Sequence, residues 1–332
     1  MHGEAAPSEI CTSLESCPVC GGRNFRKLAS PPHPIGESIF RDCLDHVRVC
    51  RCECGLELLN PRPATALLDK FYGSRIYDCH QMNRSAAADK KASWLLDLIS
   101  SQGPYSPQKR FLDFGCGGGY LLRHAQQVGW DATGFDIGEV AIETCRSHQL
   151  PVTNSIESLS PGSFDVIVVN HVLEHVEQPA SLIRLLRGLL KPNGRLFIEV
   201  PNVRSARAQL ALPVLSRHAG FDDRHRAFPI HLWYFSRKTL PRLLKANGLD
   251  PVLVTTAGMG LEELLIAKET RAAATGAGVP TNGAGSSRRS SSALALIKLK
   301  IKTAFLKSGL GENLIVVSRQ APSESAAASG TS

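Results

Sequence analysis

Asp113-Phe114-Gly115-Cys116-Gly117-Gly118-Gly119 is the stretch of this 332-residue chain that decides its fold. An apolar run that begins at Arg110 leads into it, and a helix-like segment over 120–128 follows. Glycines at alternate positions let the backbone turn sharply and approach a ligand closely, and a helix that starts there presents free N–H groups. The spacing differs from the G-x-G-x-x-G of dinucleotide-binding turns. The stretch therefore predicts a strand, a glycine turn and a helix that hold a cofactor without a pyrophosphate.

The sequence on either side alternates strand-like and helix-like segments. Short apolar runs cover 110–114, 131–135, 150–153, 164–169 and 195–200, and helical patterns cover 120–128, 139–148 and 180–190. The run at 164–169 is almost continuously apolar, as expected for a strand buried on both faces. This alternation predicts an α/β fold with a parallel sheet between helices. A helix over 236–247 and strands over 251–255 and 313–318 complete the predicted elements.

Asp136 ends the second predicted strand, 17 residues after Gly119. A carboxylate at this edge of a sheet can accept hydrogen bonds from both hydroxyls of a ribose. Each feature alone also has a purely structural explanation, because glycines form tight turns in many folds and Asp136 could cap the helix that follows. The ordered combination of strand, glycine turn, helix, strand and acid favours a ligand site.

Five ordered segments give residues 110–200 a resemblance to the class I S-adenosylmethionine-dependent methyltransferases, in their broad subgroup that acts on small molecules and lipid precursors. The matching segments are 112–117, 134–137, 164–167, 171–176 and 190–194. The resemblance implies S-adenosyl-L-methionine as the cofactor and a Rossmann-like seven-stranded sheet whose last strand is antiparallel. The strands over 251–255 and 313–318 would then form the closing pair. It implies that the cofactor contacts Asp113, Gly115, Cys116, Gly117, Gly119, Asp136, Ile137, Asn170 and His171.

Two histidines follow the fourth predicted strand in His171-Val172-Leu173-Glu174-His175. The ubiquinone-biosynthesis O-methyltransferases resemble this segment, and in them a Glu-x-x-Glu-His arrangement is associated with a divalent metal. His171 stands where that pattern has its first glutamate, which argues against Mg²⁺ because Mg²⁺ prefers oxygen ligands. Either histidine is a candidate general base for an acceptor hydroxyl. Alternatively, Glu174 and His175 only brace the loop.

His231 lies in a second histidine-containing segment, 231–236, which the resemblance assigns to the acceptor side. It is therefore a further candidate base. The preceding Arg224, His225 and Arg226 fit either contact with an anionic acceptor such as a phosphate or simple solvation.

Cysteines cluster near the N-terminus of the chain. Cys17 and Cys20 form a C-x₂-C pair followed by a glycine, and Cys50, Cys52 and Cys54 come later. In a chain with ten cysteines and no recognisable secretory signal, this pattern predicts a structural Zn²⁺ site rather than disulfides. Cys17, Cys20 and Cys54 would supply three ligands, and the fourth would be Cys52 or Cys50. Free thiols without a metal are the alternative, although some members of the resembling subgroup carry such a zinc ribbon.

Composition and motifs divide the chain into five parts. These are a zinc-ribbon-like module over 1–60, a helical cap or linker over 61–108, a methyltransferase core over 109–258, an insertion over 259–311, and a final strand with a disordered tail over 312–332. The formal charge is +8, and seven basic residues but no acidic residue fall in 270–311. The insertion is predicted to contain a disordered linker and a basic amphipathic helix over 293–309. Such a helix is compatible with peripheral membrane contact or with packing on the domain.

The sequence therefore predicts an enzyme that transfers a methyl group from S-adenosylmethionine to a hydroxyl, amine or carbon of a small-molecule, sugar or lipid-linked acceptor. A competing hypothesis is a zinc-ribbon module that binds nucleic acid or protein and carries an accessory methyltransferase fold. The ribbon lacks the interleaved aromatic and basic residues typical of nucleic-acid binding. The glycine spacing disfavours a nicotinamide dehydrogenase. Without an apolar run of membrane-spanning length or a signal segment, the cytoplasm is the expected compartment.

Overall fold

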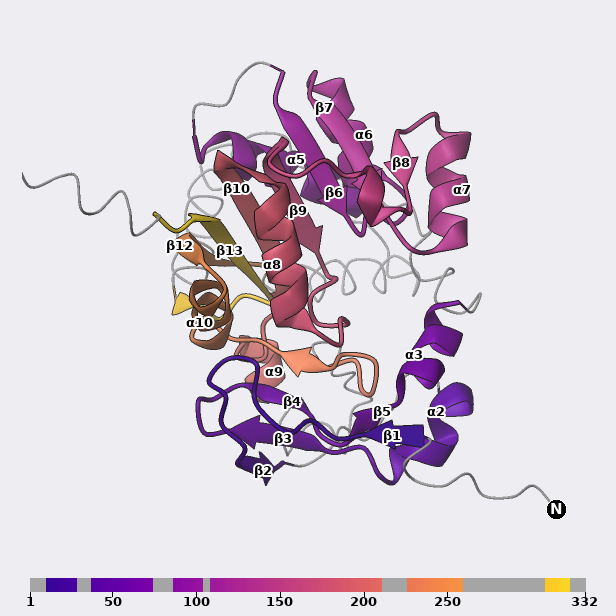
Figure 1. The fold of residues 1–332 in the computed structure, drawn as a ribbon, viewed down its shortest axis with the longest axis vertical. Helices are drawn as coiled ribbons and strands as arrows, with labels where there is room; N and C mark the ends of the chain where they lie inside the picture. The colour runs from indigo at the N-terminus through magenta and orange to yellow at the C-terminus, as the bar shows by residue number, and fades with distance from the viewer. Residues whose placement is uncertain are drawn as a thin grey trace, which may run out of the picture.

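The computed structural model describes residues 10–28, 37–73, 86–103, 108–210, 226–258 and 308–322. Its main body is a seven-stranded sheet with helices on both faces, and a smaller sheet lies below it in the view of Figure 1. The N-terminal cysteines belong to this smaller part. No helix within the described ranges is long and apolar enough to cross a membrane.

The main sheet has the strand order β12-β13-β10-β9-β6-β7-β8. Its strands are β6 (Arg110–Phe114), β7 (Asp131–Phe135), β8 (Val152–Thr153), β9 (Phe164–Asn170), β10 (Leu190–Pro201), β12 (Leu249–Ala257) and β13 (Asn313–Gln320). Strands β10, β9, β6, β7 and β8 run parallel, whereas β13 is antiparallel to both β10 and β12. The predicted α/β fold and its seven-stranded sheet, with an antiparallel last strand, are confirmed.

Helices cover both faces of this sheet because its strands are apolar on both sides. They are α5 (Ala86–Ser100), α6 (Tyr120–Gln127), α7 (Glu139–Ser147), the short 3₁₀ helix η1 (Ile156–Ser158), α8 (Pro179–Leu189) and α10 (Thr239–Ala246). The short α9 (Ala206–Leu210) follows β10 and lies near the smaller sheet in Figure 1. Along β9, Val166 and Val168 pack in one apolar cluster with α5 and α6, whereas Ile167 and Val169 pack in another with α8 and α10. Successive side chains of a strand point to opposite faces, so this one strand serves both cores.

The smaller sheet has the order β11-β4-β3-β2 and lies beside a two-stranded pair, β1 with β5. Its elements are β1 (Cys11–Thr12), β2 (Phe25–Lys27), α2 (Glu37–Leu44), β3 (Val49–Cys52), β4 (Glu57–Leu59), β5 (Arg62–Pro63), α3 (Thr65–Tyr72) and β11 (Trp233–Tyr234). Strand β11 pairs antiparallel with β4 although it comes from the segment after β10. The N-terminal module is thus completed by a strand that the sequence analysis did not anticipate.

Some boundaries differ from the sequence predictions. Residues 191–194, which separate the helix predicted over 180–190 from the strand predicted over 195–200, lie inside β10, whose pairing with β9 shifts register between Leu190 and Arg195. Helix α8 accordingly ends at Leu189, and the strand predicted over 150–153 is reduced to β8. Residues 259–307 and the tail from 323 lie outside the described residues. The basic helix predicted over 293–309 therefore lies outside them except for its last two residues.

Candidate active site and zinc ribbon

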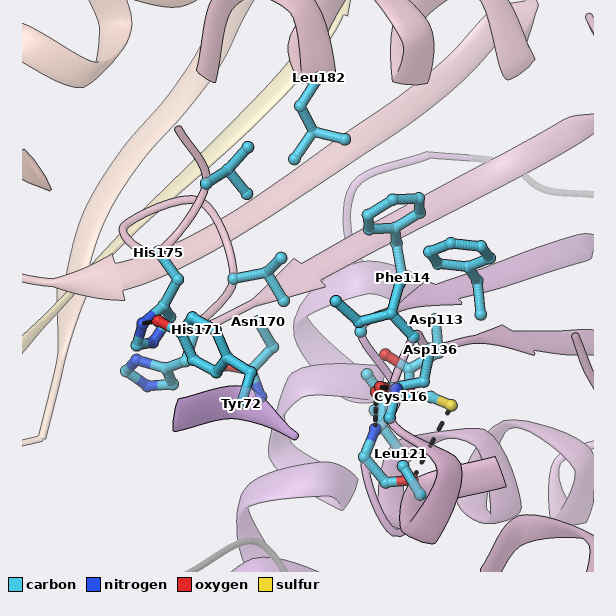
Figure 2. Close-up of a pocket in the computed structure, with 18 of the residues that line it drawn as sticks. Tyr72, Asp113, Phe114, Cys116, Leu121, Asp136, Asn170, His171, His175 and Leu182 are labelled. Atoms are coloured by element: carbon cyan, nitrogen blue, oxygen red, sulfur yellow. Dashed lines mark hydrogen bonds between the residues drawn. The ribbon is translucent and has the colours of Figure 1, made fainter. Parts of the chain in front are cut away.

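A cavity of about 760 Å³ opens at the carboxyl ends of β6, β7 and β9 (Figure 2). Ligands bind at this edge in open α/β sheets. The residues predicted to contact the cofactor all line the cavity except Gly119, which immediately precedes α6. Of the three candidate bases, His171 and His175 line the cavity and His231 does not. Helices α3, α5 and α8 complete the walls.

The glycine turn has a backbone that side chains disfavour. Gly115, Gly117 and Gly119 have φ angles of 80°, 50° and 74°, in the left-handed region that glycine enters at little cost. A Cβ at Gly115 would collide with Val172, and a Cβ at Gly119 would lie 2.9 Å from the Sγ atom of Cys145. Conformation therefore favours glycine at all three positions, and lack of space excludes a side chain at Gly115 and Gly119.

Asp136 is fixed at the end of β7 by two backbone donors. The N–H of Gly117 donates to Oδ2 at 2.8 Å, and the N–H of Gly138 donates to Oδ1 at 2.9 Å. Each oxygen keeps a further lone pair, so the carboxylate can accept the two hydroxyls of a ribose. The adjacent Ile137 is 76% exposed and offers an apolar wall of the cavity to a flat ring. This arrangement fits the adenosine part of S-adenosylmethionine.

Two further acceptors line the cavity at the ends of the neighbouring strands. Asp113 is buried, and burial together with the charge of Asp136 raises its pKa to about 7. The side chain of Asn170 has a buried Oδ1 that accepts no hydrogen bond within the described residues. A buried acceptor without a donor is destabilising, so a bound ammonium group would satisfy it. The pair fits the methionine part of the same cofactor.

His171 lies between two buried glutamates. Its Nδ1 is 3.1 Å from Oε1 of Glu174, and its Nε2 is 3.7 Å from Oε1 of Glu199. Lys91 on α5 forms a 2.8 Å salt bridge with the same oxygen of Glu199. Burial would lower the pKa of His171, but the two carboxylates raise it to about 9. His171 is therefore a cation at neutral pH and has no lone pair with which to act as a base.

The two glutamates beside this imidazole, Glu174 and Glu199, are ionised at neutral pH. Burial would raise the pKa of each carboxyl, but contact with His171 and, for Glu199, the charge of Lys91 hold both pKa values at about 2. The cluster therefore contains two cations and two anions at neutral pH.

His175 differs from His171 in charge, although it is only four residues away. Burial lowers its pKa, so the ring is neutral at pH 7. Its Nδ1 lies 2.7 Å from the hydroxyl of Tyr72 and 3.3 Å from the carbonyl oxygen of Ile230. The ring of His231 packs edge-on against it, with 4.6 Å between the ring centroids. Among the candidate bases, His175 is thus the neutral imidazole at the cavity wall.

Glu174, His175 and His231 also bring one possible metal-ligand atom each within 4.8 Å of one another. Oε2 of Glu174 accepts no hydrogen bond in the part of the chain that the structure describes. One carboxylate and two imidazoles suit a transition metal better than Mg²⁺. His171, which replaces the first glutamate of the metal-associated pattern, is engaged with Glu174 instead. The donor set does not fit Mg²⁺.

Cys17, Cys20, Cys52 and Cys54 bring their sulfur atoms within 4.8 Å of one another. The Sγ atoms of Cys17 and Cys54 are 3.7 Å apart, and those of Cys20 and Cys52 are 3.5 Å apart. Four sulfurs in one group are the donor set of a structural zinc site. The Sγ atom of Cys50 instead donates a hydrogen bond to the carbonyl oxygen of Asn60 at 3.1 Å. Of the two alternatives for the fourth ligand, the structure thus groups Cys52 with the others.

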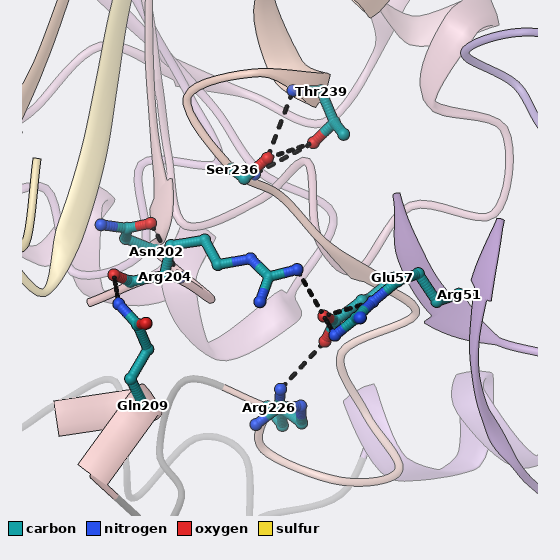
Figure 3. A network of polar contacts seen from close by, with 8 residues as sticks. All are labelled: Arg51, Glu57, Asn202, Arg204, Gln209, Arg226, Ser236 and Thr239. Atoms are coloured by element: carbon teal, nitrogen blue, oxygen red, sulfur yellow. Dashed lines mark hydrogen bonds and ion pairs between the residues drawn. The ribbon is translucent and has the colours of Figure 1, made fainter. Parts of the chain in front are cut away.

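A buried ion cluster joins this cysteine module to the main body (Figure 3). Glu57 on β4 is fully buried and pairs with Arg51 at 2.6 Å, Arg226 at 2.9 Å and Arg204 at 3.1 Å. Burial would raise the pKa of Glu57, but the arginines keep it lowered. Arg226, for which the sequence left acceptor binding or solvation open, is buried in this cluster. Arg224 and His225 lie outside the described residues.

Sequence reasoning missed two residues that line the cavity, Tyr72 and Lys91, and one that contacts His171, Glu199. Glu199 had a visible signal, because it is the one charged residue in the apolar run 196–200 of a buried strand, and a buried charge requires a partner. Tyr72 and Lys91 had none, because they lie on helices whose contacts with the sheet depend on tertiary packing.

The fold and the cavity together define a methyltransferase of the α/β class. The family described as "Methyltransferase domain" matches residues 80–254, more than half of the chain. The chain belongs to this family, and the resemblance seen in its sequence is confirmed.

Curated relatives match part of the chain. The chain is 38% identical over 112 residues to a "Ubiquinone biosynthesis O-methyltransferase" of Pseudomonas aeruginosa (strain UCBPP-PA14), covering 31% of this chain and 48% of the relative. It is 34% identical over 166 residues to a protein of the same name from Ralstonia nicotianae, covering 47% of this chain and 68% of the relative. The chain spans about half the length of the first of these relatives.

Among solved structures, the chain is similar to the Burkholderia thailandensis 1,6-didemethyltoxoflavin-N1-methyltransferase. The sequence identity is 16% and the TM-score is 0.48, with 88% of this chain and 100% of the other covered.

Proposed function

We propose that this protein transfers a methyl group from S-adenosylmethionine to a small-molecule acceptor with an apolar body. The observation that carries the proposal is Asp136, whose carboxylate is fixed by two backbone N–H donors beside a glycine turn and faces a cavity. Its unused lone pairs suit a ribose diol. Asp113 and Asn170 offer acceptors for the ammonium group at the neighbouring strand ends.

The residues of the chain contribute mainly by positioning. When bound, the cofactor supplies a sulfonium-activated methyl group, and transfer is an in-line displacement that depends on alignment and exclusion of water. Asp136 would orient the adenosine part, while the glycine turn lets the backbone approach it closely. His171 is held as a cation between Glu174 and Glu199, so it would serve orientation and charge balance rather than proton removal.

The proton of the acceptor would go to His175. This imidazole lines the cavity and is neutral at pH 7, as a general base requires. The lining of the cavity also includes the apolar residues Leu68, Val176, Leu182 and Leu185. An acceptor with an apolar body and a hydroxyl or amine group matches this combination. His231 packs behind His175 and would act through it.

For the cysteine group we propose a structural Zn²⁺ ion held by Cys17, Cys20, Cys52 and Cys54. Four thiolates leave no open coordination position for a substrate or water, so the ion would stabilise the ribbon rather than take part in transfer.

Calorimetric titration of the zinc-loaded full chain with S-adenosylmethionine and, separately, with NAD tests the proposal. We expect binding of S-adenosylmethionine alone, and Asp136→Ala should weaken it by at least about tenfold, because a hydrogen bond to a charged group contributes about 1.5–3 kcal/mol. Asp131→Ala is the matched control, since Asp131 begins the same strand and its side chain is 65% exposed. Absence of S-adenosylmethionine binding in the unmodified protein would overturn the proposal.

A further inference from the structure

We propose that Tyr72 is a positioning residue of the acceptor site and that the zinc-ribbon module holds it against His175. The proposal rests on the proposed function in one respect, the role of His175 as the base. Tyr72 belongs to α3 and lies before residues 80–254, the part matched by the methyltransferase family. It therefore brings to the cavity a group that the family domain itself does not supply.

The contacts of Tyr72 place it at both the cavity and the base. Its side chain lines the cavity, and its ring meets that of His175 edge-on at a centroid distance of 5.7 Å (Figure 2). Its hydroxyl is 2.7 Å from Nδ1 of His175 and donates to the carbonyl oxygen of Ile230 at 3.3 Å. Nδ1 is itself 3.3 Å from that carbonyl oxygen.

This geometry selects one neutral form of the imidazole. The carbonyl oxygen of Ile230 can only accept, so the Tyr72 hydroxyl donates its proton there. The hydroxyl oxygen is then an acceptor for an N–H on Nδ1, and the carbonyl is a second acceptor for the same N–H. Both contacts favour a proton on Nδ1 of His175, which leaves the lone pair on Nε2. Tyr72 thus fixes the neutral form in which Nε2 can accept a proton.

The position of Tyr72 depends on the ribbon. The preceding residue, Phe71, is buried, and its ring lies 5.5 Å from that of Phe40 on α2. Phe40 and Phe71 belong to an apolar cluster that extends from the ribbon to the main sheet. Helix α3 therefore packs through Phe71 against α2 of the N-terminal module, while Leu68 and Tyr72 line the cavity. Loss of zinc should therefore displace this helix and change the hydrogen bonding of His175.

Nitrogen-15 NMR of the histidine-labelled full chain, saturated with zinc, tests the proposal without any acceptor. The signals of His175 are assigned with His175→Gln. We expect a protonated Nδ1 and an unprotonated Nε2 in the unmodified protein. Tyr72→Phe keeps the ring but removes the hydroxyl, so the signals should shift toward the form with the proton on Nε2. Tyr120→Phe is the control, because Tyr120 lines the cavity but belongs to α6.

Removing zinc with a chelator provides the second arm, and it should move the His175 signals in the same direction as Tyr72→Phe. Unchanged His175 signals in Tyr72→Phe, or a proton found on Nε2 in the unmodified protein, would overturn the role of Tyr72. Unchanged signals after zinc removal would overturn the role of the ribbon. Calorimetry with S-adenosylmethionine on the same samples tests the proposed function separately. If the protein did not bind S-adenosylmethionine, the proposed function would be wrong, but the NMR result for Tyr72 and His175 would still hold.

Discussion

Replacing Glu174 by glutamine should remove most of the free energy of unfolding that protonated His171 contributes. Glu174 is fully buried in the loop after β9, and its Oε1 is 3.1 Å from Nδ1 of His171. Glutamine has nearly the same shape and keeps a hydrogen-bonding oxygen, but it removes the negative charge. The pKa of His171 should then fall back toward its ordinary value, because only Glu199 remains as an anionic partner.

The magnitude follows from the pKa of His171, which rises from 6.5 to about 9 in the folded protein. Each pKa unit corresponds to about 1.4 kcal/mol, so this rise sets an upper limit of about 3.4 kcal/mol of stabilisation. The His171 side chain is 36% exposed to the cavity, and solvent there screens the interaction. We therefore expect about 1–2 kcal/mol, of which Glu174 supplies the larger share.

The sign of the pH dependence is fixed by the direction of the shift. Because the folded pKa is raised, the stabilisation is fully present below 6.5 and is lost as the pH rises through about 9. Urea unfolding followed by tryptophan fluorescence, at about pH 6 and about pH 9.5, gives the free energies of unfolding. The difference in free energy of unfolding between the unmodified protein and Glu174→Gln should be smaller by about 1–2 kcal/mol at the higher pH. Thiol ionisation affects both proteins alike and cancels.

Glu143→Gln provides the control, because Glu143 is an exposed carboxylate on α7. It should leave the free energy of unfolding unchanged within about 0.5 kcal/mol at both pH values. If Glu174→Gln gave a constant loss of stability from the lower to the higher pH, His171 would not be a cation held by Glu174, and the division of roles between the two histidines would be wrong.

Three further changes test other parts of the structure. Cys52→Ser should lose the bound zinc measured by elemental analysis, whereas Cys50→Ser should keep one zinc ion per chain; the reverse result would assign the fourth ligand to Cys50. Glu57→Gln should lower the free energy of unfolding in urea by about 3 kcal/mol, because it leaves buried arginine charge without its anion; a loss below about 0.5 kcal/mol would contradict this. Gly115→Ala should weaken S-adenosylmethionine binding in calorimetry by about a hundredfold, or about 2.7 kcal/mol, whereas Gly129→Ala, also at positive φ but facing open space, should not.

Much of the fold was predictable because its signals are local. The glycine spacing after β6, the alternation of apolar runs and the acid after β7 each follow from a few adjacent residues. The order of those signals was enough to predict the sheet and the edge at which the cavity lies. The continuous apolar run of β9 reflects a strand buried on both faces, and no distant information is needed to read it.

The contacts that complete the site were not predictable, because they join elements far apart in the chain. Strand β11 belongs to the ribbon sheet only because Trp233 and Tyr234 pair with Leu58 and Glu57. A two-residue strand carries too little periodicity to be recognised, and its partner lies in another predicted module. The placement of Tyr72 at His175 has the same origin, since it follows from the packing of α3 on the ribbon.

The charge states of the two cavity histidines show most directly what tertiary structure adds. His171 and His175 are equivalent candidates in the sequence, yet one is held as a cation by carboxylates from β10 and the loop after β9, and the other is kept neutral by burial. Lys91 and His171 balance Glu174 and Glu199, so the cluster is neutral as a whole. A cluster that is neutral as a whole does not oppose a sulfonium cation beside it. The two glutamates thus allow a positively charged group to remain in a cavity proposed to bind a positively charged cofactor.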